Sequence, residues 1–187
     1  FILDRHQAKG VFEFTRDGVF VRQIGSRGNG PGEYIVPGDF SLDMVNGRIY
    51  ILDDQKQTIS QYNISDGKFQ KTIALDKESG IRSHRIQWAD GSLFVDLYCF
   101  DEQPATDGLL RRIDLSTAKS DGVYMSSAYN KQWHDPERID SKVFYPGEKN
   151  AYRFVKQFMD TVFYIGSQGV MPYMALQSED LLRPQDL

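Results

Sequence analysis

Only one cysteine and three histidines occur among the 187 residues, and no long apolar run is present. Cys99 has no partner for an intramolecular disulfide, and we interpret it as a buried structural thiol because free cysteine is among the most buried residue types. The absence of a run of about 18 apolar residues predicts that the chain has no membrane span. The sequence also contains no charged region followed by an apolar leader, so we identify no signal peptide.

An excess of basic residues is absent as well. The 22 Lys and Arg are outnumbered by 26 Asp and Glu, the net charge is −4, and the two signs are interspersed. Nucleic-acid-binding domains concentrate positive charge on one face because they neutralise phosphates. We therefore expect no nucleic-acid partner. With 40% hydrophobic and 13% aromatic residues, the composition is typical of a folded globular domain.

The chain contains an internal repeat. Phe-Ile-Leu-Asp at residues 1–4 corresponds to Tyr-Ile-Leu-Asp at residues 50–53, an offset of 53 − 4 = 49. Asp-Gly-Val-Phe at residues 17–20 corresponds to Asp-Gly-Lys-Phe at residues 66–69 at the same offset, 66 − 17 = 49. Two separate matches at one spacing indicate a repeated structural unit.

Each unit divides into as many as four strand-like runs that are separated by turn residues. No segment keeps a 3.6-residue apolar period over three turns, which predicts low helix content. We expect an all-β fold: a single β-propeller domain over residues 1–187, built from four-stranded antiparallel blades, with about three and a half blades in this chain. The expected blades cover residues 1–25 (partial), 39–75, 84–126 and 143–177 (partial).

The turn residues predict that the two ends of each blade differ. Asn-Gly and Asp-Gly pairs supply the positive φ that tight hairpins need. They lie between first and second strands or between third and fourth strands: Asn46-Gly47, Asp90-Gly91, Asp17-Gly18, Asp66-Gly67 and Asp121-Gly122. The connections at the opposite end are longer, at residues 26–38, 54–57, 76–83, 101–108 and 127–141. Binding sites concentrate on longer loops held by a rigid scaffold, so we place the functional site at this end, the long-loop face.

Several of these motifs together resemble a known group of proteins. They are the glycine-rich connector at residues 25–34, the Tyr-Ile-Leu-Asp strand, the Asp-Gly-x-Phe turn and Asp-Thr-Val-Phe-Tyr at residues 160–164. The sequence resembles the six-bladed, NHL-repeat-like β-propeller proteins of gut Bacteroidales, which are mostly uncharacterised. The resemblance implies a closed six-bladed disc in the full-length protein, often exported as a lipoprotein to the cell envelope, either periplasmic or anchored in the outer membrane.

The number of blades leaves three interpretations open. The resemblance favours a chain that is part of a longer propeller. A four-bladed ring is the alternative, and it requires the polar segment at residues 177–187 to pair with the first strand, although its β-propensity is poor. The third interpretation is a part of a larger multidomain sensor or scaffold.

The catalytic candidates are weak. The glycine-rich connector has neither the Gly-Lys-Ser/Thr ending nor the following helix of a phosphate-binding loop, so we interpret it as a linker between blades. His6, His84 and His134 are weak candidates for a metal site, because no local pair of ligands accompanies them. Asp4 and Asp53 occupy equivalent repeat positions, which indicates a structural capping role and makes a glycosidase pair of carboxylates the less favoured explanation.

The ligand-binding candidates lie in the connectors of the long-loop face. We select Arg27, Arg82, His84, Trp133 and His134. Tyr34, Tyr129 and Trp133 lie in connectors, where exposure to a ligand is one interpretation; for Trp133 we favour the alternative, a ring that pins a long loop to the blade edge. The hypothesis is a non-enzymatic cell-envelope β-propeller that binds a protein, a peptide or a glycan through this face, without a cofactor. The alternative is a metal-dependent lyase or hydrolase on the same face.

Overall fold

The computed structural model describes residues 1–75, 81–99, 108–125, 142–156 and 159–177. In these ranges every regular element is a strand, and no helix long and apolar enough to cross a bilayer occurs. The chain divides into two compact units. The first is Phe1–Lys77 with Ser83–Gln87, and the second is Glu78–Arg82 with Trp88–Leu187.

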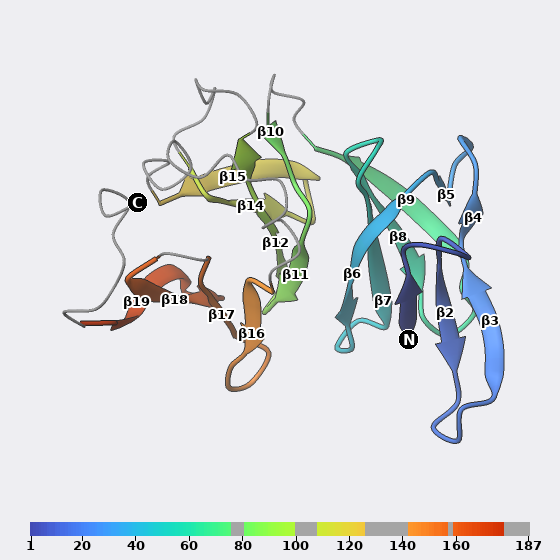
Figure 1. Cartoon of the computed structure of the whole chain (residues 1–187), viewed down its shortest axis with the longest axis horizontal. Coiled ribbons are helices and arrows are strands. Elements are labelled where there is room, and N and C mark those ends of the chain that lie inside the picture. Colours follow the sequence, from blue (N-terminus) through green and yellow to red (C-terminus); the bar gives the residue numbers. More distant parts are fainter. Residues whose placement is uncertain (76–80, 100–107, 126–141, 157–158, 178–187) are drawn as a thin grey trace. The chain divides into compact units, whose positions relative to one another are not determined.

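The first unit contains two antiparallel sheets (Figure 1). The three-stranded sheet consists of β1 (Ile2–Asp4), β2 (Gly10–Phe14) and β3 (Phe20–Ile24). A short parallel pair, β4 (Ser26–Arg27) and β5 (Glu33–Tyr34), lies in the connector. The four-stranded sheet follows in sequence order: β6 (Pro37–Asp43), β7 (Arg48–Asp53), β8 (Thr58–Asn63) and β9 (Phe69–Ala74).

Two further four-stranded antiparallel sheets follow, each in sequence order. The third sheet consists of β11 (Ile86–Ala89), β12 (Ser92–Asp96), β14 (Leu110–Asp114) and β15 (Lys119–Tyr124). The fourth consists of β16 (Phe144–Pro146), β17 (Tyr152–Phe154), β18 (Thr161–Gly166) and β19 (Gly169–Ala175). A two-stranded pair, β10 (Ile81–Arg82) and β13 (Tyr98–Cys99), completes the strands. The predicted all-β fold of four-stranded antiparallel blades is confirmed.

The tight turns form largely where the sequence predicts them. Gly18, Gly47 and Gly67 have φ between 63° and 82°, in the left-handed region that glycine adopts at little cost. At the turn between β11 and β12 both Asp90 (φ 45°) and Gly91 (φ 96°) are left-handed, as a two-residue type I′ hairpin requires. The predicted difference in loop length is seen only in part in the first unit. The connections at residues 5–9 and 54–57 are about as short as the turns at residues 15–19, 44–47 and 64–68, and only the connector at residues 25–36 is clearly longer.

Two details of the prediction are wrong. Asp121-Gly122 does not form the turn of the third sheet but lies inside β15. Asp114 ends β14 early, because its Oδ1 accepts hydrogen bonds from the Ser116 amide and hydroxyl and from the Thr117 amide. The fourth sheet begins with β16 (Phe144–Pro146), a strand that the sequence analysis did not predict.

Each unit has its own apolar core. In the first, Val11, Ile24 and Tyr34 pack with Ile49, Ile51 and Tyr62, all at most 1% exposed. In the second unit, one core is shared by the third and fourth sheets, and its largest side chains are Phe94, Phe144 and Phe154. The backbone of Cys99 lies in β13, whereas its side chain, with the predicted burial of the thiol, falls outside the described part of the structure.

Candidate functional site

Aspartates end the equivalent strands β1, β7 and β12 of three successive sheets. Asp4 folds the loop after β1 around its own carboxylate. Its Oδ1 accepts hydrogen bonds from the amides of His6 (2.9 Å) and Gln7 (3.0 Å), and its Oδ2 accepts one from the amide of Ala8 (3.2 Å). These backbone hydrogen bonds hold the pKa of Asp4 below its usual value. The predicted structural role of Asp4 is confirmed.

Asp53 has the same role in a buried setting. It is 2% exposed. Its Oδ1 accepts hydrogen bonds from the amides of Gln55 and Lys56 (2.9 Å each) in the following loop. Its carboxylate also accepts one from Ile35 (2.6 Å) and a longer one from Val36 (3.4 Å) in the connector before β6. One carboxylate therefore fixes two loops of the long-loop face.

The third aspartate, Asp96, faces a buried lysine. Asp96 is completely buried and Lys156 is 9% exposed. The Lys156 ammonium donates to the carbonyl of Leu97. Burial lowers the pKa of Lys156 to about 8, against the opposing effect of the Asp96 carboxylate. The Asp96 carboxylate therefore acts on Lys156 through its charge, whereas the hydrogen bond of the ammonium group is to a backbone carbonyl.

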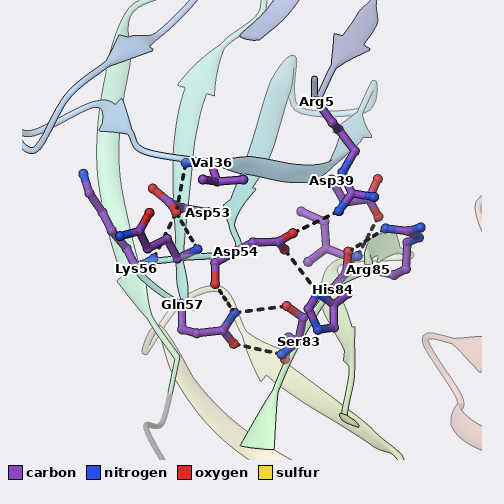
Figure 2. Close-up of polar contacts among 12 residues, drawn as sticks. Arg5, Val36, Asp39, Asp53, Asp54, Lys56, Gln57, Ser83, His84 and Arg85 are labelled. Atoms are coloured by element: carbon purple, nitrogen blue, oxygen red, sulfur yellow. Dashed lines mark hydrogen bonds and ion pairs between the residues drawn. The ribbon is translucent and has the colours of Figure 1, made fainter. Parts of the chain in front are cut away.

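A charged cluster lies beside the capped loops of the first unit. Figure 2 shows the Asp54 carboxylate pointing between Arg5 and His84. Arg5 Nη2 lies 3.0 Å from Asp54 Oδ2, and His84 Nδ1 lies 3.6 Å from Asp54 Oδ1. The side chains of Arg5, Asp54 and His84 are 27%, 14% and 12% exposed. They come from three different places in the chain: the loop after β1, the loop after β7 and the segment before β11.

The segment that carries His84 is anchored on both sides of that residue (Figure 2). The Gln57 amide group donates to the Ser83 carbonyl (3.2 Å), and its oxygen accepts from the Ser83 amide (2.8 Å). Asp39 Oδ2 accepts a hydrogen bond from the Ile86 amide (3.0 Å). Because both ends are held, His84 has a fixed position beside Asp54.

The glycine-rich connector packs against the same face. The Lys56 ammonium donates to the carbonyls of Gly28 (2.9 Å) and Glu33 (2.8 Å), so this lysine fastens the connector to the loop after β7. Tyr34 is 1% exposed and its hydroxyl donates to the Ile24 carbonyl (2.9 Å). The exposure considered for Tyr34 is therefore not observed: its ring packs in the apolar core of the first unit, and the hydrogen bond satisfies the buried hydroxyl.

The structure brings one of the five selected ligand-binding residues into this cluster, namely His84. Arg27 in β4 and Arg82 in β10 are exposed and belong to different units. Trp133 and His134, like Tyr129, lie outside the described residues. His6 is exposed on the loop that Asp4 caps. Among the residues whose placement is described, no group of three or more His, Cys, Asp or Glu side chains has the arrangement of a metal site.

Sequence reasoning missed the pairing of Arg5 with Asp54, although a signal was present. The two residues are 49 positions apart, which equals the repeat offset, so they occupy equivalent positions in two successive repeats. Opposite charges at equivalent positions pair where neighbouring blades bring the same loop together. Searching for such pairs at the repeat offset would have identified this contact.

Comparisons with known proteins agree with this architecture. A family model described as a domain of unknown function, DUF4934, matches residues 1–186. A Bacteroides fragilis NCTC 9343 protein provisionally named as exported has a similar structure, with a TM-score of 0.75 and 22% identity over 95% of this chain and 48% of that chain. A member of the DUF4221 family from Bacteroides vulgatus ATCC 8482 has a TM-score of 0.53 and 12% identity over 90% and 51% of the two chains.

A catalytically inactive virginiamycin B lyase from Staphylococcus aureus, with quinupristin, has a TM-score of 0.54 and 14% identity over 94% of this chain and 52% of that one. The chain thus spans about half the length of each of these three structures. No match to the sequence was found among the curated proteins. These likenesses establish the β-propeller fold, and the family match over nearly every residue shows that the chain belongs to the DUF4934 family.

Proposed function

We propose that this chain is a non-enzymatic binding module that holds a protein, peptide or glycan ligand on its long-loop face. The observation that carries the proposal is the Arg5–Asp54–His84 cluster, which is assembled from three separate connections at that end of the first unit. The capped loops around it are rigid, because buried Asp53 alone accepts hydrogen bonds from four amides. A rigid surface with fixed charges binds at a lower entropic cost than a flexible one.

The chemistry of the cluster suits a polar ligand. Arg5 carries a fork of donors that matches carboxylates and other paired acceptors, and it is the most exposed of the three side chains, at 27%. His84 and Asp54 lie deeper and orient the guanidinium through the shared carboxylate (Figure 2). We therefore assign ligand contact to Arg5 and a positioning role to Asp54 and His84.

A binding screen tests the proposal. The probes are a glycan array and a peptide library, applied to the wild-type chain and to Arg5→Ala and His84→Ala. Arg27→Ala, Arg82→Ala, Trp133→Ala and His134→Ala test the remaining candidates. Arg16→Ala is the matched control, because Arg16 is an exposed arginine in the β2–β3 turn at the opposite end.

We expect any ligand found by the screen to bind Arg5→Ala at least about tenfold more weakly, which corresponds to about 1.4 kcal/mol, and Arg16→Ala with unchanged affinity. Equal binding by Arg5→Ala, His84→Ala and the wild type, with both variants folded, contradicts the placement of the site.

The proposal for the whole protein is a six-bladed, NHL-repeat-like propeller exported to the cell envelope as a lipoprotein. Apolar side chains on the first and last sheets support further blades: Ile2 and Phe20 are each 56% exposed, and Met171 and Tyr173 are 43% and 53% exposed. The likeness to a protein provisionally named as exported supports the location. Fractionation of cells that express the full-length gene, with labelled palmitate, tests both parts, and an unlabelled cytosolic product contradicts them.

The second candidate is a metal-dependent lyase or hydrolase on the same face. The half-buried His84 beside Asp54 is the observation that favours it, and virginiamycin B lyase has a similar fold. Elemental analysis of the purified full-length protein provides the test. Stoichiometric zinc that is lost in His84→Ala supports this candidate, whereas a metal content that His84→Ala does not change contradicts it.

A further inference from the structure

The second unit contains a cleft of about 300 Å³ that no proposed role uses. It lies between the end of β15, represented by Tyr124 and Met125, and strands β18 and β19 of the fourth sheet, represented by Phe163 and Val170. Both sides belong to the same compact unit. The cleft is thus a feature of one folded body, separate from the Arg5–Asp54–His84 cluster of the first unit.

The lining of the cleft is mainly apolar. Met159, which is 5% exposed and part of the core, contributes to it, and Phe163, Val170 and Tyr124 pack against the same core. Two aromatic residues, Tyr124 and Phe163, line the cleft, and aromatic side chains pack favourably against planar ligands. Met125 and Met159 supply thioethers, whose flexible, polarisable side chains adapt to ligand shape.

A polar group stands on one side of this lining. Asp160 lies immediately before β18, and Thr161 is the first residue of that strand. Both line the cleft, and the Thr161 hydroxyl donates a hydrogen bond to Asp160 Oδ1 (2.9 Å). The position of the carboxylate is further constrained because the backbone carbonyl of Asp160 accepts a hydrogen bond from the Leu176 amide (2.6 Å). Among the described residues that line it, the cleft therefore combines a mainly apolar surface with the carboxylate of Asp160.

The backbone at the opposite side is strained. Met125 has a φ of 66°, in the left-handed region that residues with a Cβ rarely adopt. Strained residues of this kind concentrate at ligand-binding positions. This conformation is independent of the lining chemistry, and it occurs at a residue that itself contacts the cleft.

We propose that this cleft is a binding site for a small aromatic amine, with the ring against Phe163, Tyr124 and the methionines and the ammonium group at Asp160. The size is appropriate: an apolar cavity of about 150 Å³ takes benzene, so one of about 300 Å³ admits a bicyclic ring with a short side chain. The charge of Asp160 selects a cationic head group over an anionic one. The ligand class follows from these two properties together.

Tryptamine and indole-3-acetate are matched probes, because both carry an indole ring and they differ in the charge of the side chain. Calorimetric titration and saturation-transfer NMR with the whole chain measure their binding. Small ligands gain about 0.3 kcal/mol or more per heavy atom, so we expect a dissociation constant of roughly 0.1–2 mM for tryptamine and at least threefold weaker binding of indole-3-acetate. No saturable binding of tryptamine overturns the proposal, and equal binding of the two probes overturns the assignment to amines.

Two variants locate the site. Val170→Phe fills the cleft and is expected to abolish binding, whereas Val45→Phe makes the same change at a side chain that is 65% exposed in the β6–β7 turn and serves as the matched control. Asp160→Asn retains an acceptor for Thr161 and is expected to weaken tryptamine binding about threefold, the effect of a partly exposed ion pair. The same variant is expected to bind indole-3-acetate more tightly than the wild type, because it no longer repels the carboxylate of that probe. Because Asp160 is exposed, this variant keeps the proposal testable if Val170→Phe does not fold. Unchanged tryptamine binding in folded Val170→Phe or in Asp160→Asn overturns the proposal.

Discussion

Replacing Asp53 by alanine tests whether one buried carboxylate holds the long-loop face together. Asp53 is 2% exposed and accepts three hydrogen bonds of 2.6–2.9 Å and one of 3.4 Å from backbone amides. A hydrogen bond to a charged group contributes about 1.5–3 kcal/mol, and a buried donor left without a partner costs about 1–3 kcal/mol. Since the freed loops regain some hydrogen bonds to water, we expect a loss of about 3–5 kcal/mol in the free energy of unfolding, near the upper end for single substitutions.

Asp4→Ala is the matched control. Asp4 occupies the equivalent repeat position and accepts three amide hydrogen bonds, but the amides of its loop are exposed and water replaces the lost acceptor. Urea unfolding followed by aromatic fluorescence measures both variants, and equal m-values show that the same transition is observed. We expect Asp53→Ala to lose several times more stability than Asp4→Ala. An equal or smaller loss in Asp53→Ala refutes the argument that burial sets the contribution of this cap.

Three further predictions follow from the same structure. The pKa of Lys156 is about 8 in the folded state, below its unfolded value of 10.5, so the free energy of unfolding rises by about 3 kcal/mol as the pH increases from about 8 to about 10.5. Unfolding measured over this pH range should lose the rise in Lys156→Met, and an unchanged profile in that variant contradicts the prediction. A double-mutant cycle of Arg5→Ala and Asp54→Ala gives a coupling of about 1 kcal/mol, and zero coupling contradicts the ion pair. Gly32→Ala lowers the melting temperature, because φ is 72° and the added Cβ lies 2.7 Å from Phe69 Cβ; an unchanged melting temperature contradicts that strain.

The aspartates at the ends of β1, β7 and β12 show how a repeat acquires different roles. The carboxylate of Asp4 closes a local loop, that of Asp53 joins two loops, and that of Asp96 faces the buried Lys156. The residue type is the same at the three positions, whereas the partners differ. The repeat therefore supplies a scaffold, and the residues that follow two of these aspartates, Arg5 and Asp54, form the charged cluster.

Local chemistry in the sequence was sufficient for most strands and most turns, although not for β16 (Phe144–Pro146). The 49-residue repeat placed the equivalent strands, and the bounds of β7 (Arg48–Asp53) agree with the prediction because its continuous apolar run and the flanking turn residues are local signals. Gly18, Gly47 and Gly67 likewise have the positive φ that their turns require. The turn at Asp121-Gly122 failed because Asp114 forms a competing turn earlier in the chain.

Only the tertiary structure decided which residues meet. His84 was a candidate in the sequence, but its approach to Asp54 depends on Gln57 and Asp39, which anchor the segment from another sheet. Tyr34 was considered as an exposed aromatic residue, yet its ring packs in the apolar core with Ile24, whose carbonyl accepts the buried hydroxyl. The sequence alone therefore determined the repeating strands and their tight turns, whose interactions span a few residues. The packing of neighbouring sheets determined the site, because its contacts join residues between 26 and 49 positions apart in the chain.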